Sequence, residues 1–310
     1  WIRYGSYYNE NNPWWPYFKY FNTYKARLAT LLQNADMYTD IALLTPIPDL
    51  WTRYGVQTEP FPGPGPLAVP YTSLVWEAIH KHGGGCDYTS ERVIAGSTVE
   101  NGKLCYGPKQ YGTLFLVGIE GIEPATLEKL HTFVQQGRIF CIERYPSKSL
   151  GFVDYERRDR EVRDWVEKLK GYPERFILLE RPEGDDFYAW YPAMCEKYRI
   201  PHYLGFSSPD RYLMQNRYRT DDGTEILFFA YANRREPHRT EVRVGPEVAG
   251  GRYPWLLDTQ SGERWRIPSE GGTFTLEFGP CDSYVVVFDK QKNGEPWRPL
   301  PAAGANAQRL

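Results

Sequence analysis

Five glutamates stand where they could supply carboxyl groups for an acid–base reaction: Glu10, Glu77, Glu91, Glu120 and Glu143. Hydrolysis of a glycosidic bond uses two carboxyl groups, which normally come from different loops at one face of a scaffold. Glu120 and Glu143 follow predicted parallel strands, at the edge where open α/β sheets bind ligands. Glu77 falls within a predicted helix, where a solvated surface position is the simpler interpretation.

The loop around Glu10 has the composition most typical of a sugar-binding site. Asn9, Glu10 and Asn12 could hydrogen-bond sugar hydroxyls, while Trp14 and Trp15 could stack on a sugar ring. In the alternative interpretation the asparagines cap the following helix and the tryptophans fill a domain junction. Both interpretations stay open at this point. The five residues form the predicted substrate-binding site, and the sequence does not identify a catalytic acid and base.

Other kinds of site find little support. Cys141 lies inside a predicted strand and no G-x-C-x-G turn occurs, so a nucleophilic cysteine is not predicted. Residues 118–121 are too short for a nucleotide-binding glycine loop. The five cysteines include no C-x-x-C pair, and His80 and His82 do not share a helix face. The residues therefore indicate no metal ligands and no cofactor.

The charge and hydrophobicity of the chain narrow its range of partners. The net charge is -2 over 310 residues, which gives no general attraction to nucleic acid or to an anionic membrane. No apolar run approaches the ~20 residues that span a bilayer. The 10 tryptophans and 24 tyrosines suit stacking on sugars as well as ordinary cores. We expect neither nucleic acid nor membrane as a partner.

The first 208 residues predict a loop and a helix, followed by a parallel α/β domain. In residues 1–35, apolar side chains at three- and four-residue spacing indicate a helix from about residue 17 to residue 33. In residues 36–208, short apolar strands alternate with helices, which is typical of a parallel sheet covered on both faces. This organisation favours a flavodoxin-like or glutamine-amidotransferase-like domain. The predicted strands are residues 40–45, 86–90, 112–118, 138–143 and 176–179.

Residues 209–290 predict an antiparallel β-sandwich. Turn signals such as Asp-Asp-Gly at 221–223 and Gly-Gly at 250–251 separate short strands. No aromatic platform can be placed on one face of this sandwich from the sequence. Residues 291–310 are polar and rich in proline and alanine, which predicts a loosely held tail. The predicted strands are residues 212–218, 225–233, 240–244, 253–258, 264–267, 273–278 and 283–289.

Several stretches together resemble the C-terminal half of glycoside hydrolase family 106, the α-L-rhamnosidase-type enzymes. The first is NENNPWWPYF at residues 9–18, followed by residues 24–27 and 31–33. The second is GRIFCIERYP at residues 137–146, with residues 148–151. The third is WLLDTQSGE at residues 255–263, with residues 276–278 and 282–288. These motifs cover nearly the whole chain, but they are architectural rather than catalytic.

The resemblance implies a parent protein with a catalytic (β/α)8 barrel before residue 1. This chain would keep only the last loop and helix of that barrel, in residues 1–35. The acid and base would lie mainly on the barrel, so we expect the isolated chain to be a fragment without activity. The parent would cleave a rhamnoside, with inversion, in a plant or microbial polysaccharide. The family is also associated with a calcium ion, for which no clustered carboxylates are found here.

The partners implied by the resemblance are carbohydrate and the rest of the parent chain, and a periplasmic or secreted location is expected for the parent. Two alternatives remain. The chain could be a non-catalytic carbohydrate-binding module, or a structural module that mediates oligomerisation. It could also be an independent α/β hydrolase or amidotransferase, against which the missing nucleophile turn counts.

Overall fold

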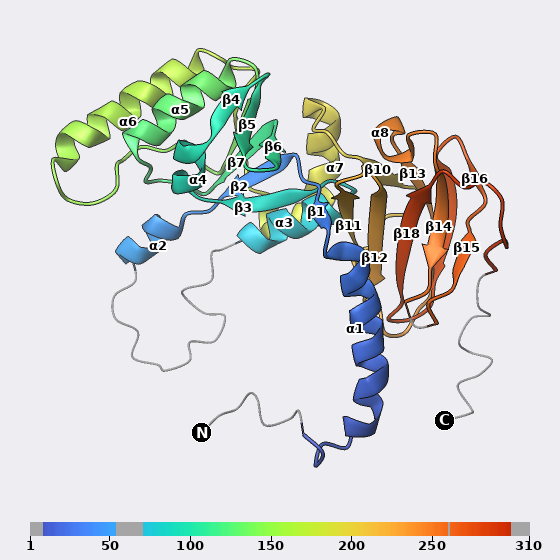
Figure 1. Cartoon of the computed structure of the whole chain (residues 1–310). Helices are drawn as coiled ribbons and strands as arrows, with labels where there is room; N and C mark the ends of the chain where they lie inside the picture. Colours follow the sequence, from blue (N-terminus) through green and yellow to red (C-terminus); the bar gives the residue numbers. More distant parts are fainter. Residues whose placement is uncertain (1–8, 54–70, 260, 299–310) are drawn as a thin grey trace. The chain divides into compact units, whose positions relative to one another are not determined.

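The structure is a computed structural model, and it describes residues 9–53, 71–259 and 261–298 (Figure 1). The chain divides into two compact units, of which one is Tyr38–Leu204 and the other joins Trp1–Met37 with Gly205–Leu310. The first unit holds a parallel sheet and the second holds antiparallel sheets, so the mixed α/β class is confirmed. Residues 1–8, 54–70 and 260, and the part of the predicted tail beyond residue 298, lie outside the described residues.

The parallel unit is built on five strands in the order β3-β2-β7-β8-β9. These are β2 (Ile41–Leu44), β3 (Cys86–Thr89), β7 (Thr113–Val117), β8 (Arg138–Ile142) and β9 (Phe176–Leu179). Every residue of β2 and β7 is buried, as expected for strands of a sheet that is covered on both faces. The five strands predicted from the sequence are confirmed in position; four of them centre on short apolar runs, whereas β3 (Cys-Asp-Tyr-Thr) does not.

Two layers of helices enclose this sheet, and the alternation along each strand assigns side chains to one layer or the other. Leu114 and Leu116 join the core beneath α5 and α6, whereas Phe115 and Val117 join the core beneath α3 and α7. The helices of the unit are α2 (Ile47–Arg53), α3 (Thr72–Lys81), α4 (Glu91–Gly96), α5 (Pro124–Val134), α6 (Tyr155–Lys170), η2 (Glu183–Asp185) and α7 (Phe187–Tyr198). A small antiparallel sheet adds β4 (Thr98–Glu100), β5 (Lys103–Tyr106) and β6 (Lys109–Tyr111).

The order of the strands determines where a ligand would bind to the parallel sheet. The chain begins the sheet with β2, adds β3 on one side, and then crosses to add β7, β8 and β9 on the other side. The direction of winding therefore reverses at β2. In open parallel sheets, ligands bind in the crevice outside the carboxyl ends of the strands at this point.

The antiparallel unit contains two sheets. The larger has the order β1 (Ala35–Met37), β11 (Leu213–Thr220), β12 (Glu225–Tyr231), β18 (Ser283–Asp289), β14 (Tyr253–Leu257) and β15 (Arg264–Arg266). The smaller has the order β10 (Leu204–Phe206), β13 (His238–Val244), β17 (Thr273–Phe278) and β16 (Ser269–Glu270). Aromatic rings join the two sheets: Phe278 of β17 lies 5.0 Å from Tyr284, and Phe274 lies 6.2 Å from Phe288. All seven strands predicted between residues 209 and 290 have a counterpart in these sheets.

The N-terminal helix belongs to this antiparallel unit. It consists of a short turn η1 (Trp15–Tyr17) and α1 (Phe18–Leu32), close to the predicted residues 17–33. The Tyr24 hydroxyl lies 3.1 Å from Ser283 Oγ, and Arg27 donates to the carbonyl oxygen of Thr259 at 3.2 Å. The helix α8 (Pro246–Ala249), which the sequence analysis did not predict, completes the unit.

A buried ion pair joins β11 to the first residue of β12 in the larger sheet. Arg217 of β11 is fully buried and donates from Nε to Glu225 Oε2 at 2.8 Å and from Nη2 to Oε1 at 3.0 Å. Arg219 donates to the same carboxylate at 2.6 Å. A bidentate guanidinium is the geometry that best offsets the loss of hydration of two buried charges.

Candidate functional site

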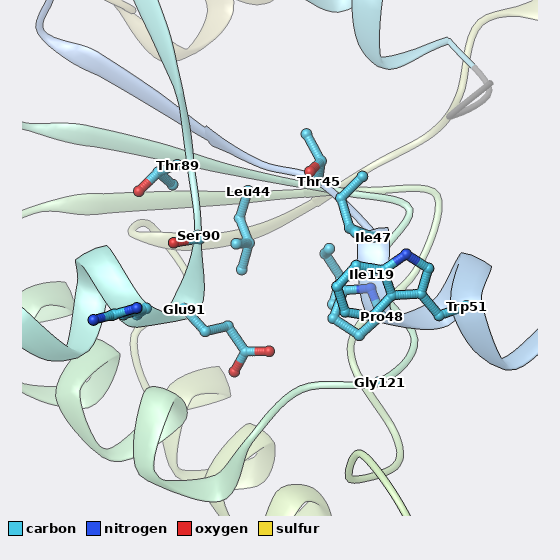
Figure 2. Close-up of a pocket in the computed structure, with 11 residues that line it drawn as sticks. Leu44, Thr45, Ile47, Pro48, Trp51, Thr89, Ser90, Glu91, Ile119 and Gly121 are labelled. Atoms are coloured by element: carbon cyan, nitrogen blue, oxygen red, sulfur yellow. The ribbon is translucent and has the colours of Figure 1, made fainter. Parts of the chain in front are cut away.

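A pocket of about 270 Å3 lies at the carboxyl ends of three parallel strands (Figure 2). We call it the sheet-edge pocket. Leu44 ends β2, Thr89 ends β3, and Ile119 follows β7, and all three line it. The pocket thus lies at β2, where the winding of the sheet reverses. The strand order and the pocket agree on the location of a ligand site in this unit.

The two sides of the sheet-edge pocket differ in chemistry. Pro48 and the indole of Trp51, both on α2, gather with Ile119 on one side, while the Glu91 carboxyl group lies across the open space (Figure 2). Ser90 adds a hydroxyl group beside Glu91. A flat apolar wall facing hydroxyl and carboxyl groups suits a small ring with polar substituents.

Glu91 is positioned by the start of α4 and is the acidic group of this pocket. The hydroxyl of Ser90 caps the helix by accepting from the Val93 N–H at 3.3 Å. The N–H of Glu123 and the hydroxyl of Thr126 both donate to Glu91 Oε2, at 2.8 and 2.6 Å. Burial raises the pKa of Glu91, and these two hydrogen bonds only partly oppose the shift. Since both donors bind Oε2, Oε1 stays available to a ligand.

A second carboxylate, Asp49, holds the apolar wall in place. It lies on α2, is 3% exposed, and accepts the N–H of Glu120 at 3.0 Å and of Gly121 at 2.9 Å. This contact ties α2 to the loop after β7. Asp49 therefore positions the wall that carries Trp51 rather than facing a ligand itself. The sequence analysis did not identify Asp49 or Trp51 as candidate site residues, although both lie shortly after the strand predicted at residues 40–45.

Glu143 lies at the same edge of the sheet, directly after β8, and its backbone is in the left-handed region with φ of 76°. The Tyr71 hydroxyl donates to its Oε2 at 2.5 Å, and Arg144 pairs with its Oε1. Arg181 stacks on the Tyr71 ring at 4.2 Å. Burial works to raise the pKa of Glu143, but the Tyr71 and Arg144 contacts outweigh it and lower that pKa. Glu143 is thus an ionised, well-anchored carboxylate rather than a proton donor.

The remaining predicted glutamates are paired or exposed. Glu120 lies 3.0 Å from Lys148 Nζ in an ion pair. Glu77 pairs with Lys81 one turn later on α3, at 2.6 Å, on the solvated side expected for it. Glu10 is exposed on the N-terminal loop.

The five residues predicted to bind substrate lie on the turn that leads into η1, of which Trp15 is the first residue. The side chain of Asn9 accepts the N–H of Asn11 at 2.9 Å, and that of Asn12 accepts the N–H of Trp14 at 2.8 Å. These bonds shape the turn itself, whereas neither η1 nor α1 has a side-chain cap, so the capping interpretation of the asparagines is not confirmed. The turn fixes the backbone that leads into the two tryptophans.

Both tryptophans of this loop face solvent in the described chain. Trp14 is 70% exposed, and Trp15 is 46% exposed with its ring edge against Phe18 at 5.8 Å. Two exposed indoles in sequence are uncommon on a free surface and suit contact with a ligand or another domain.

Cysteine chemistry is not supported by the described structure. Cys141 is completely buried in β8, and burial strongly raises the pKa of its thiol. A catalytic thiol needs access and a lowered pKa, and Cys141 has neither.

Within residues 9–53, 71–259 and 261–298, no group of three or more His, Cys, Asp or Glu side chains could hold a metal ion. In the same ranges, no helix has the length and apolar character to cross a membrane.

Comparison with known proteins points to enzymes that act on sugars. No family model matches the chain. A protein of Formosa agariphila that carries the provisional name β-glucuronidase is 24% identical over 293 residues, which is 92% of this chain. The chain spans 22% of the length of that relative.

Solved structures of glycoside hydrolases give weaker likenesses. The GH27 β-L-arabinopyranosidase of Geobacillus stearothermophilus, solved with arabinose, is 12% identical, covers 58% of this chain and 45% of its own, and has a TM-score of 0.21. AmyP, solved with maltotriose, is 9% identical, covers 75% of this chain and 53% of its own, and has a TM-score of 0.23. The chain is thus similar in sequence, over 92% of its own length, to a protein with the provisional name of a glycoside hydrolase.

Proposed function

We propose that the chain is the C-terminal portion of a glycoside hydrolase whose main catalytic residues lie in a domain before residue 1. The observation that carries the proposal is the similarity, over 92% of this chain, to a protein provisionally named β-glucuronidase. Because the chain covers only 22% of that protein, most of such an enzyme would lie elsewhere.

The contacts of the carboxyl groups in the parallel unit support the proposal that the main catalytic residues lie in another domain. Hydrolysis needs two carboxyl groups that face one bound sugar. Glu143 and Glu120 are held in ion pairs, and Asp49 is engaged by two backbone amides. Glu91 is the one carboxyl group among the described residues that line the sheet-edge pocket. The sheet-edge pocket can therefore hold a ring, but its described lining supplies only one of the two carboxyl groups that hydrolysis needs.

The proposed organisation follows the domains expected from the sequence. Residues 36–208 form an amidotransferase-like or flavodoxin-like domain without amidotransferase chemistry, and the order β3-β2-β7-β8-β9 supports it because it is the flavodoxin-like order. Residues 209–290 form a β-sandwich, which the ring contacts between the two antiparallel sheets support. Residues 1–35 are the end of a barrel, and residues 291–310 are a tail.

The partners in this proposal are carbohydrate and the rest of the parent chain. Tyr17, Tyr20 and Phe21 are each more than half exposed near the start of α1, and such a surface suits contact with another domain. The substrate is a glycoside of a plant or microbial polysaccharide, and the parent acts in the periplasm or outside the cell. A calcium ion in the parent would bind outside the described residues, which offer no group of three or more His, Cys, Asp or Glu side chains for it.

The substrate sugar is the finer part of the proposal, and it has a direct test. The family resemblance favours an α-L-rhamnoside, whereas the name of the relative favours a β-glucuronide. The longer gene product should be assayed on aryl α-L-rhamnoside, aryl β-glucuronide and a wider aryl-glycoside panel. We expect turnover of the rhamnoside with inversion, read by NMR of the first product anomer. Turnover of the glucuronide alone would refute the rhamnosidase assignment, and no turnover on the panel would refute the hydrolase.

The loop at residues 9–15 contributes to substrate binding in this proposal. Replacing Trp14 or Trp15 by alanine in the longer protein should raise KM about tenfold with little change in kcat, because a stacking contact is made equally in ground and transition states. Tyr212→Ala is the matched control, since Tyr212 is also about half exposed but lies outside the loop. Equal effects of all three variants on KM would argue against a binding role for the loop.

A further inference from the structure

A second pocket lies within the antiparallel unit, and we call it the β14–β18 pocket. It has a volume of about 480 Å3 and lies where β14 ends and β18 begins. Its walls come from residues 256–259, 281–284 and 295–298, together with Tyr24 of α1 and Trp265 of β15. The volume falls within the ~300–1,000 Å3 typical of small-molecule sites.

Besides Tyr24 of α1, three aromatic rings line this pocket: Trp265, Tyr284 and Trp297. Tyr284 and Trp297 meet edge to face, with ring centres 5.7 Å apart. The Tyr284 hydroxyl donates to the carbonyl oxygen of Glu277 at 2.6 Å, which anchors its ring. The backbone N–H of Trp297 donates to the carbonyl oxygen of Arg266 at 2.9 Å, which fixes the main chain that carries the indole. Such prior ordering lowers the entropy lost on binding.

This aromatic cluster corrects the sequence analysis, which found no aromatic platform in the sandwich. Its members are separated in sequence by up to 32 residues, from Trp265 to Trp297. The pairing of β14 with both β15 and β18 brings the first two together, and the bridge from Arg266 to Pro296 brings the third.

The polar lining is rich in acceptors and carries excess negative charge. Among the described residues, three carboxylates line the pocket, those of Asp258, Asp282 and Glu295, against one guanidinium, that of Arg298. Asp282 is oriented by the N–H of Ser283, which donates to it at 2.8 Å. Carboxylates accept hydrogen bonds from ligand hydroxyls, and they repel a ligand carboxylate.

We propose that the β14–β18 pocket binds an uncharged saccharide of one or two sugar units and discriminates against uronic acids. A sugar ring presents an apolar C–H face to aromatic rings and hydroxyl donors to the surrounding acceptors. The excess of carboxylates is the reason for the discrimination against an anionic sugar. The inference goes beyond the proposed function, because binding to this unit requires no hydrolysis and no other domain.

The experiment measures binding to the 310-residue chain itself. Cys281 lines the pocket and is the exposed cysteine among the described residues, so its thiol is a local reporter. The chain, in a Cys105→Ser background, is titrated with rhamnose, glucose, cellobiose and glucuronate at pH 7. Tryptophan fluorescence and the rate of maleimide labelling of Cys281 are recorded. We expect at least one neutral sugar to quench fluorescence and protect Cys281, with glucuronate at least tenfold weaker.

Three variants locate the effect. Trp297→Ala should weaken neutral-sugar binding about tenfold. Glu295→Gln, a change at an exposed position, should raise the affinity for glucuronate several-fold relative to the affinity for a neutral sugar. Phe152→Ala removes an exposed ring of the other unit that lines neither pocket, and it should change nothing. No protection of Cys281 by any neutral sugar up to about 50 mM, or glucuronate binding as well as glucose, would overturn the proposal.

Discussion

Replacing Glu225 by alanine is expected to destabilise the antiparallel unit by about 3–5 kcal/mol, because the fully buried Arg217 is left without its counter-ion. The pair is bidentate and lies between neighbouring strands, so neither water nor another acceptor can easily replace the carboxylate. The measurement is the opening free energy of the β11 and β12 amides in hydrogen exchange. This local measurement is needed because the chain has two units, which can unfold separately.

The matched control is the Arg239–Glu277 pair, which also joins neighbouring strands but is exposed. Its atoms are 3.4 Å apart, and the side chains are 73% and 41% exposed. Glu277→Ala should therefore cost no more than about 0.5 kcal/mol. In addition, Arg217→Met combined with Glu225→Leu should recover most of the lost stability, because no buried charge remains. A double variant as unstable as Glu225→Ala would contradict this account.

Phe140→Ala is expected to destabilise the parallel unit by about 3–5 kcal/mol through the cavity it leaves. Phe140 is completely buried in β8, stacks on Phe115 at 5.0 Å and meets Tyr198 at 5.5 Å. It thus contacts both the neighbouring strand and α7. The measurement is again the opening free energy of β7 and β8 amides.

Phe152→Ala tests whether burial is the cause, since it makes the same chemical change in the same unit. Phe152 is 92% exposed, so the expected change is within about 0.5 kcal/mol. Similar losses for the two variants would mean that the sheet centre is not the core of this unit.

The sequence predicted those elements whose residues carry their own signal. Residues 114–117 form an unbroken apolar run within β7, and the Asp-Asp-Gly turn at 221–223 separates β11 from β12. The missed strands are two or three residues long, such as β16 (Ser269–Glu270) and β1 (Ala35–Met37), and they form because a neighbouring strand pairs with them. The helix α2 was missed because prolines at its start read as a loop.

The candidate sites show a similar limit. Glu91, Glu120 and Glu143 were identified as carboxyl groups, and their positions past the parallel strands could be predicted from the strand pattern. Which of them faces a pocket could not, because Glu91 depends on Glu123 and Thr126 of the next helical segment. The rings of the β14–β18 pocket come together only through strand pairing, which no local pattern records.

We propose that this chain is part of a glycoside hydrolase and that its described residues hold only part of a hydrolytic site. The most direct test of this proposal is the turnover of aryl α-L-rhamnoside and aryl β-glucuronide by the purified 310-residue chain. We predict no hydrolysis above the rate in buffer, and the same result for the Glu91→Gln variant. Hydrolysis by the chain that Glu91→Gln abolishes would contradict the account, because it would place a complete catalytic pair in the parallel unit.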